Sequence, residues 1–491
     1  MAPRTLSDFL EELGQAGELV RVEAPVDPLV EAAAITDRIA RAGGPALLFG
    51  TVRGSGVPLV TNVLGSGARL LRALGAGSLD EATQHFAAQV SGGEAAGWFD
   101  RLRGGQEGPG RRLAPRSVRT GVCQQIARLG ADVDLGELPV LQSWPGETAR
   151  VITAGQVVVD DREGGVRQFA RYDAAILDRQ RLALIWDAHQ PPAQIMARWS
   201  SSEPLPVALV LGGDPLNLLS AMAPLPQGVD PLLVAGILRQ KPVDLVACRR
   251  VPLEVPAEAE MVIEGHIDPR ESPASVGQVG TPSGRFRPSV AGAVMHVTAI
   301  LQRANPVYPA IVFAPPPHEA AFIARAMWRI CLPLVRQAIP EVVDCDLPLF
   351  GAVRHWALVS IRKRYPGHAH KVAQSLWGFA PTMFSKLLVL VDEDVSVQDY
   401  GQVLSAVAEN TDLARDVLVQ PGPADPLDAA AADGPLTTRM AIDATSKLPA
   451  ETARPWPAKM RAESAVLDLI RQRWPEYGLG PDPDEPASRP S

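Results

Sequence analysis

The stretch that decides the fold reads Arg167-Gln168-Phe169-Ala170-Arg171-Tyr172-Asp173, turns at Asp178-Arg179-Gln180-Arg181-Leu182 and ends in Trp186-Asp187-Ala188-His189. Apolar and β-favouring residues on both sides of the turn predict two strands, at residues 168–177 and 182–186. Because side chains on a strand alternate between its faces, Arg171 and Asp173 share one face and can pair. A catalytic pair and a plain cross-strand or surface ion pair are equally compatible with this spacing.

The flanking sequence continues the strand pattern. Further strands are expected at residues 151–160, 207–211, 243–248, 260–267 and 295–301, with a helical insertion near 191–199. Many short strands separated by turn residues indicate an antiparallel barrel or a sandwich, and the residues alone leave both open.

Outside this region, helices and strands alternate. The N-terminal part predicts a helix at 5–14, a strand at 19–22, a helix at 27–42 and a strand at 46–49. The C-terminal part predicts a helix at 319–329, a strand at 356–362, a helix at 367–377 and a strand at 386–391. Such alternation is typical of α/β domains. Residues 92–119 read as a linker, and the tail after Trp474 as a disordered or partner-wrapping extension.

Composition narrows the class of protein. The chain has 491 residues, 46% of them apolar, a net charge of −8 and a pI of about 5.6, which argue against a nucleic-acid partner. No apolar run reaches the length of a membrane span, and no signal peptide is apparent. The four cysteines show no CxxC spacing, which favours a reduced interior. We therefore expect a cytoplasmic enzyme or binding protein.

Several different short motifs are spread along the chain between Leu6 and Pro457. Among them are Arg41-Ala42-Gly43-Gly44-Pro45, Cys123-Gln124-Gln125, Leu138-Pro139 with Trp144-Pro145, Ile263-Glu264-Gly265, Tyr365-Pro366-Gly367-His368 and Asp443-Ala444-Thr445-Ser446-Lys447. In this order they resemble the UbiD family of decarboxylases, which use prenylated flavin mononucleotide (prenylated FMN).

The resemblance implies a mixed α/β fold. It places an N-terminal α/β domain at residues 1–120, a central FMN-binding split β-barrel at 121–315, a C-terminal α/β oligomerisation domain at 316–474 and a tail at 475–491. It also implies a homodimer or higher homo-oligomer, a prenyl-flavin synthase as cofactor supplier and a small organic acid as substrate.

The resemblance further implies a divalent metal, Mn²⁺ or Mg²⁺, with K⁺ as an additional candidate ion. In the family an Asn, a His and a Glu bind the metal, and the corresponding residues here are Gln168, His189 and Glu264. Gln168 offers the same amide oxygen one methylene further out, and oxygen donors suit a hard cation. Tyr172, Trp186, His368 and Lys447 are the expected cofactor contacts.

The catalytic positions depart from the family. Its Arg is replaced by Asp173, and its two acids, in a Glu-Gly-Pro-x-Gly-Asp/Glu pattern, are replaced by Val276 (or Ser275) and Thr281. Neither Val nor Thr is a general acid near neutral pH. The candidates for a rebuilt site are Arg171, Asp173 and Arg285, with Asp187 as a further acid. Arg285, in Arg285-Phe286-Arg287, clamps an anion or simply faces solvent.

Three functions follow from this pattern. The first is a UbiD-like decarboxylase with a non-standard site, acting on a small aromatic or unsaturated acid. The second is a non-catalytic paralogue that binds a ligand or a partner subunit. The third is a flavin-independent enzyme that uses the same cleft.

Overall fold

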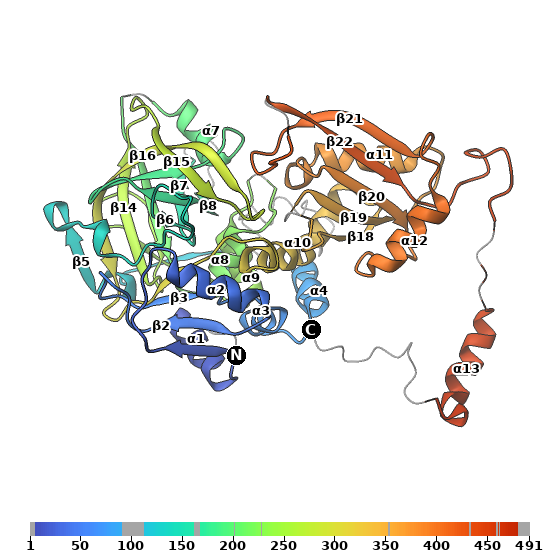
Figure 1. Cartoon of the computed structure of the whole chain (residues 1–491), viewed down its shortest axis with the longest axis horizontal. Helices are drawn as coiled ribbons and strands as arrows, with labels where there is room; N and C mark the ends of the chain where they lie inside the picture. Colours follow the sequence, from blue (N-terminus) through green and yellow to red (C-terminus); the bar gives the residue numbers. More distant parts are fainter. Residues whose placement is uncertain are drawn as a thin grey trace.

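The N-terminal part of the computed structural model forms a small α/β layer (Figure 1). The structure describes residues 5–90, 112–161, 167–200, 202–226, 228–351, 354–431, 434–457, 460 and 462–479. The N-terminal elements are α1 (Leu6–Gln15), β1 (Leu19–Val22), α2 (Glu31–Arg41), β2 (Ala46–Phe49), β3 (Leu59–Thr61), α3 (Gly67–Leu74) and α4 (Leu79–Val90). The sheet order is β1-β2-β3-β17, so β17 (Tyr308–Ala310) joins it from far along the chain.

Both strands expected in the N-terminal part have the predicted bounds, at Leu19–Val22 and Ala46–Phe49. One of the expected helices does not. The helix expected to begin near Asp27 begins at Glu31. The reason is that Leu29 bridges to Gln142 and the Val30 N–H donates to the Gln142 carbonyl at 2.8 Å, with Val30 at a positive φ of 71°, so that the residues before Glu31 are not helical. Contacts with a distant segment thus delay the helix by one turn.

The central part is built on a ten-stranded sheet. Eight of its strands follow the order β6-β9-β10-β16-β14-β11-β7-β8, and β5 (Ile126–Leu129) and β15 (Ala274–Gly280) complete it by pairing with β16. The strands on this path are β6 (Val151–Ile152), β7 (Gln156–Asp160), β8 (Arg167–Arg171), β9 (Asp173–Ile176), β10 (Arg181–Ile185), β11 (Leu205–Leu211), β14 (Met261–Ile267) and β16 (Phe286–Gln302).

The sheet curls because β8 leads into β9 through the single residue Tyr172. The strand expected at 168–177 is therefore split between β8, at one end of the hydrogen-bonded order, and β9, second from the other end. The pairing of the described strands stops short of a closed barrel, and the mixed α/β architecture is the one predicted.

Two cores lie on opposite faces of this curled sheet. On β14, Met261 and Ile263 face one core, whereas Val262 faces the other. We call the core that contains Val262 the outer core and the one that contains Met261 and Ile263 the inner core. The outer core also includes residues of α8 (Pro215–Ala221), α9 (Pro231–Arg239) and the small sheet β13-β12-β4, made of β13 (Glu254–Pro256), β12 (Asp244–Ala247) and β4 (Arg116–Val118). This alternation decides where each polar residue of β14 points.

The long helix α10 (Glu319–Ala338) lies between the central and C-terminal parts (Figure 1). One side of it joins the outer core, and Trp328, Leu332 and Val335 join the C-terminal core. The C-terminal sheet has the order β18-β19-β20-β22-β21, with β18 (Val342–Asp346), β19 (Trp356–Ile361), β20 (Leu387–Asp392), β21 (Val417–Pro423) and β22 (Leu436–Asp443). Helices α11 (His368–Gly378) and α12 (Tyr400–Asn410) cover it.

The last described helix, α13 (Ser464–Tyr477), has no buried residue and is drawn apart from the rest of the chain (Figure 1). It extends past Trp474, where an irregular tail was expected, and most of that tail lies outside the described residues. Most of the expected linker at 92–119 lies outside them too. None of the described helices combines the length and the apolar character that crossing a membrane requires.

Candidate active site

Arg171 and Asp173 pair across the junction between β8 and β9. The Arg171 guanidinium donates to the Asp173 carboxylate, and its Nε donates to the Thr153 carbonyl at 2.8 Å. The guanidinium also lies over the Phe313 ring, 4.7 Å from its centre. The expected pairing of Arg171 with Asp173 is present, although the two residues belong to different strands, and the pair is mostly buried. Three separate contacts fix the orientation of Arg171, which is what a residue that binds an anion needs.

Glu147 is a buried carboxyl group close enough to Asp173 to feel its charge, and no motif of the sequence pointed to it. It accepts the Gly280 N–H at 2.9 Å through Oε1, and the Ser143 and Trp144 N–H groups at 2.6 and 3.2 Å through Oε2. Burial raises the pKa of Glu147, and the nearby Asp173 carboxylate raises it further, against the effect of the three N–H donors. A carboxyl group with a raised pKa is suited to donate a proton.

The glycine-rich stretch forms the hairpin between β15 (Ala274–Gly280) and β16, and its own side chains supply no acid. Val276 packs into a small apolar cluster, and the Thr281 hydroxyl donates to the Arg285 carbonyl at 2.8 Å. Arg285 itself is exposed at the turn. The acidic group that contacts this hairpin is Glu147, which reaches it from another segment.

The structure does not bring the three expected metal ligands together. Both carboxylate oxygens of Glu264 accept backbone N–H groups, from Arg249 at 3.0 Å and from Arg250 at 2.6 Å. Glu264 pairs with Ala208, Ala208 with Val158, and Val158 with Phe169, the neighbour of Gln168. Glu264 is therefore three strands away from Phe169, which is roughly 14 Å along the sheet at about 4.8 Å per strand. It shares the outer face of β14 with Val262, so alternation directs it away from the inner core.

His189 lies between β10 and α7 (Pro191–Arg198), and its ring contacts Phe384 of the C-terminal part, 4.8 Å between ring centres. The Arg354 guanidinium stacks on the same Phe384 ring at 4.8 Å. Burial lowers the pKa of His189. The residue thus sits where the central and C-terminal parts meet. Within the described residues, no group of three His, Cys, Asp or Glu side chains is arranged to hold a metal ion.

A carboxylate that is absent from the expected ligand set lies beside Arg167, the residue that precedes Gln168. Asp230 caps α9 by accepting the Leu232 N–H at 2.9 Å, and its Oδ2 lies 3.4 Å from the Nε of Arg167. Burial raises the pKa of Asp230. The cation next to Gln168 is therefore a guanidinium of the chain itself. Sequence spacing could not predict this pair, because Arg167 on β8 and Asp230 before α9 are far apart in the sequence and come together only in the folded chain.

The two aromatic residues expected near a flavin do meet. The rings of Tyr172 and Trp186 are 6.0 Å apart in a T-shaped arrangement. Tyr172 is buried, and burial raises its pKa. Next to Trp186, Asp187 accepts a hydrogen bond from the Nη2 of Arg287 at 2.7 Å. Asp187 is thus committed to a partner.

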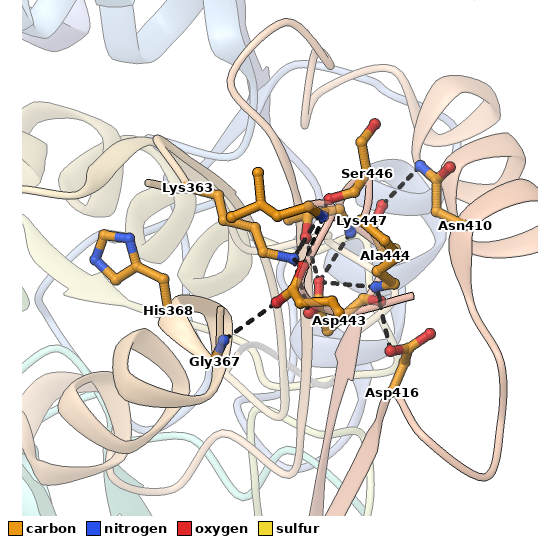
Figure 2. Close-up of polar contacts among 12 residues, drawn as sticks. Lys363, Gly367, His368, Asn410, Asp416, Asp443, Ala444, Ser446 and Lys447 are labelled. Atoms are coloured by element: carbon orange, nitrogen blue, oxygen red, sulfur yellow. Dashed lines mark hydrogen bonds and ion pairs between the residues drawn. The ribbon is translucent and has the colours of Figure 1, made fainter. Parts of the chain in front are cut away.

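The remaining two expected cofactor residues belong to the interior of the C-terminal part (Figure 2). Lys447 Nζ donates to the Asp443 carbonyl at 2.8 Å and lies 3.3 Å from carboxylate oxygens of both Asp443 and Asp416. His368 stacks on Tyr365, accepts the Arg364 N–H at 3.1 Å and places Nε2 3.2 Å from Glu341. Neither side chain reaches the central sheet, because local partners hold both.

Comparison with known proteins follows the same three parts. Models of the 3-octaprenyl-4-hydroxybenzoate carboxy-lyase (UbiD) family match the N-terminal domain at residues 10–88, the Rift-related domain at 116–316 and the C-terminal domain at 321–444. An uncharacterized protein of Aquifex aeolicus (strain VF5) is 37% identical over 97% of this chain and 99% of its own length.

Solved structures agree in fold. Vanillic acid decarboxylase of Sedimentibacter hydroxybenzoicus in its closed form superposes with a TM-score of 0.86 at 24% identity, over 98% of this chain and 100% of the other. The UbiD-class enzyme HmfF of Pelotomaculum thermopropionicum, solved with FMN, gives 0.75 at 28% identity over 95% and 98%. Its evolved dimeric form with prenylated FMN gives 0.73 at 27%, again over 95% and 98%. The chain belongs to the UbiD family of decarboxylases.

Proposed function

We propose that this chain decarboxylates a small aromatic or unsaturated carboxylic acid at the site formed by Arg171, Asp173 and Glu147. The observation that supports this most is the buried ion pair of Arg171 with Asp173, together with the buried Glu147, whose pKa is raised by burial and by the charge of Asp173. The family's own acids and Arg are replaced in the sequence, and this set supplies the same three kinds of group from other positions. Membership in a decarboxylase family supports the reaction class.

Each residue has a role in the proposed reaction. The bond between the substrate and its carboxylate breaks, carbon dioxide leaves, and one proton is added to the carbon that carried it. Arg171 binds the carboxylate of the substrate before cleavage, since a guanidinium pairs with carboxylates in a fixed geometry. Asp173 orients Arg171, and Glu147 in its protonated form donates the proton.

The proposal includes prenylated FMN, which supplies an electron sink for the cleavage when bound. Support comes from HmfF, whose structures contain FMN or prenylated FMN. The residues offered as contacts are Trp186, whose ring is partly exposed beside Tyr172, and Arg287 near it. Buried aromatic faces and a guanidinium suit a flavin ring and its phosphate.

A divalent metal does not fit the residues that the family pattern pointed to. Both oxygens of Glu264 accept backbone N–H groups, and Asp230 is neutralised by Arg167, the residue that precedes Gln168. A second cation beside Arg167 would be repelled. No step of the proposed reaction therefore depends on a metal, and Arg167 is the positive group at that position. Potassium has no proposed ligand either.

The other expectations remain predictions. They are a homodimer or higher homo-oligomer, a prenyl-flavin synthase that supplies the cofactor, and a cytoplasmic location. The evolved dimeric form of HmfF supports the first by analogy.

The test is to produce the chain together with a prenyl-flavin synthase, and to measure its absorbance, its flavin content by mass spectrometry and its release of carbon dioxide from a panel of aromatic and unsaturated acids. A flavin-loaded protein that decarboxylates at least one acid supports the proposal. A flavin-free protein without activity would favour a non-catalytic paralogue, and activity without flavin would favour the flavin-independent enzyme.

A further inference from the structure

We propose that His318 is a positioning residue, which fixes the hairpin Gly277–Gly284 against Arg171 and Glu147. This inference rests on the proposed function for its catalytic consequence, but its structural part stands alone. His318 precedes α10 and is almost fully buried, and its Nε2 lies 2.8 Å from the Pro282 carbonyl at the tip of the hairpin.

The hairpin is pressed between two segments of the chain. At Gly284, whose φ is +73°, a Cβ atom would come within 2.5 Å of the Pro315 backbone nitrogen. At Gly280, a Cβ atom would come within 2.9 Å of the Glu147 carboxylate. A side chain at Gly284 would force the Pro315 backbone away, and a side chain at Gly280 would displace the Glu147 carboxylate. The glycines that mark this hairpin in the sequence are thus required by contacts with 313–318 and 144–147.

The same segment that carries His318 also holds Arg171. The Phe313 ring lies 6.4 Å from the His318 ring and 4.7 Å from the Arg171 guanidinium. The Phe313 carbonyl accepts the indole N–H of Trp144 at 2.7 Å, and Trp144 adjoins the turn that presents Glu147. The contacts therefore form a ring from Phe313 through His318 to the hairpin, and back through Glu147 and Trp144 to Phe313, whose side chain also lies against Arg171.

The other side of His318 faces the protein interior. A cavity of about 10 Å³ lies there, lined by Asp37, Asn62 and Glu319 among others, with room for one water molecule. One oxygen of each of these three side chains, and the Nδ1 of His318, lack a hydrogen-bond partner among the described residues. Burial lowers the pKa of His318, so the ring is neutral.

The tautomer of His318 follows from these contacts. Because Nε2 faces a carbonyl, Nε2 carries the hydrogen, and Nδ1 can only accept. One water in the cavity can donate to Nδ1 and to one of the acceptor oxygens, which would hold this tautomer. The hydrogen bond to Pro282 is thus kept by a polar pocket that the N-terminal part helps to form. The two sides of this pocket are some 250 positions apart in the sequence, since Glu319 on α10 accepts the Leu64 N–H.

The test compares His318→Leu, which removes the donor, with His318→Gln, whose side-chain amide can still donate to Pro282. Hydrogen exchange of the backbone amides of Gly277–Gly284 is measured together with kcat and KM of the flavin-loaded enzyme. His370→Gln, on the exposed surface of α11, is the matched control. If the Leu variant does not fold, His318→Asn, which is too short to reach, replaces it.

In His318→Leu we expect hairpin exchange to rise about tenfold, the equivalent of one lost hydrogen bond. We expect kcat to fall about 10- to 100-fold with KM changed less than about threefold, because a misplaced site slows the reaction more than it weakens binding. His318→Gln should restore most of both. Unchanged hairpin exchange in His318→Leu would overturn the inference. If the wild-type enzyme decarboxylates nothing, the proposed function fails, while hydrogen exchange still decides the role of His318.

Discussion

Two buried clusters of charge in this molecule look alike in composition and differ in how their charges are used. In the C-terminal part, Lys363 and Lys447 lie among Asp416, Asp443 and Glu451 (Figure 2). Burial acts to raise the pKa values of Asp416 and Glu451, but hydrogen bonds from their basic neighbours lower both overall. In the central part, Glu147 has a raised pKa and only backbone N–H donors.

The difference separates a structural cluster from a candidate catalytic one. With Arg415, which pairs with Asp416 at 2.7 Å, the C-terminal cluster has three cations for three carboxylates. Its contacts tie the segment that follows β22 to the domain, since Glu451 also accepts the Gly367 N–H at 3.1 Å. The central cluster has one guanidinium for two carboxyl groups. An excess acid beside an oriented cation can exchange a proton, whereas a neutralised cluster resists any change of charge.

The largest effect is expected in the C-terminal cluster. Replacing Lys447 by Met leaves Asp416 and Asp443 buried with too few cations, and should lower the free energy of unfolding by about 3–5 kcal/mol. Urea unfolding measures this. Turnover per folded molecule, measured well below the melting temperature, should stay unchanged. Lys371→Met, a partly exposed lysine, is the control and should cost no more than about 1 kcal/mol. Loss of turnover without loss of stability in Lys447→Met would contradict the structural role.

Arg171→Met should lower turnover rather than stability. We expect kcat/KM to fall at least about 100-fold, or about 2.7 kcal/mol, because the variant cannot bind the substrate carboxylate. Arg171→Lys should recover only part of this, since lysine lacks the planar fork. Steady-state kinetics measure both. Arg181→Met, which breaks a surface pair with Asp178, is the control. A fully active Arg171→Met would remove this residue from the proposed site.

Glu319, the first residue of α10, tests whether a carboxyl group outside the proposed site also has a raised pKa. Burial raises its pKa to about 7, so the neutral form is favoured in the folded state. The resulting stabilisation is present below pH 4.5 and is lost as the pH rises through about 7, up to about 3 kcal/mol. Glu319→Gln should therefore be relatively more stable than wild type at pH 8 than at pH 5, as measured by the melting temperature. Parallel pH curves would contradict the raised pKa.

The smallest effect is expected at Arg285. This side chain is exposed at the turn of the hairpin, so Arg285→Ala should change kcat/KM by no more than about twofold. The same kinetic assay measures it beside Arg171→Met. A loss comparable to that of Arg171→Met would move the anion-binding role from β8 to the hairpin.

Local sequence patterns predicted much of the fold. The strands β1 and β2 have the expected bounds because each is a short run of strand-forming residues between clear turn signals. The strand expected at 295–301 is instead the end of β16, which begins at Phe286, because pairing with β15 extends it. The helix expected at 319–329 continues to Ala338 through Pro333, since packing on both sides supports α10.

The site was harder to predict, because its contacts join distant segments. Pairing of Arg171 with Asp173 follows from alternation on a strand, and it was expected. Glu147 was missed because its partner Gly280 lies 133 positions away. Alternation shows that Glu264 faces opposite to Ile263, but only the three-dimensional packing shows which face is the inner one.

The central claim is that Glu147 is the proton donor of the rebuilt site, and the pH profile of kcat for Glu147→Gln tests it most directly. In the wild-type enzyme, turnover should decline at high pH as Glu147 loses its proton. In the variant, turnover should fall at least about 100-fold with flavin content unchanged. Turnover within about threefold of wild type, with the same decline at high pH, would contradict the account.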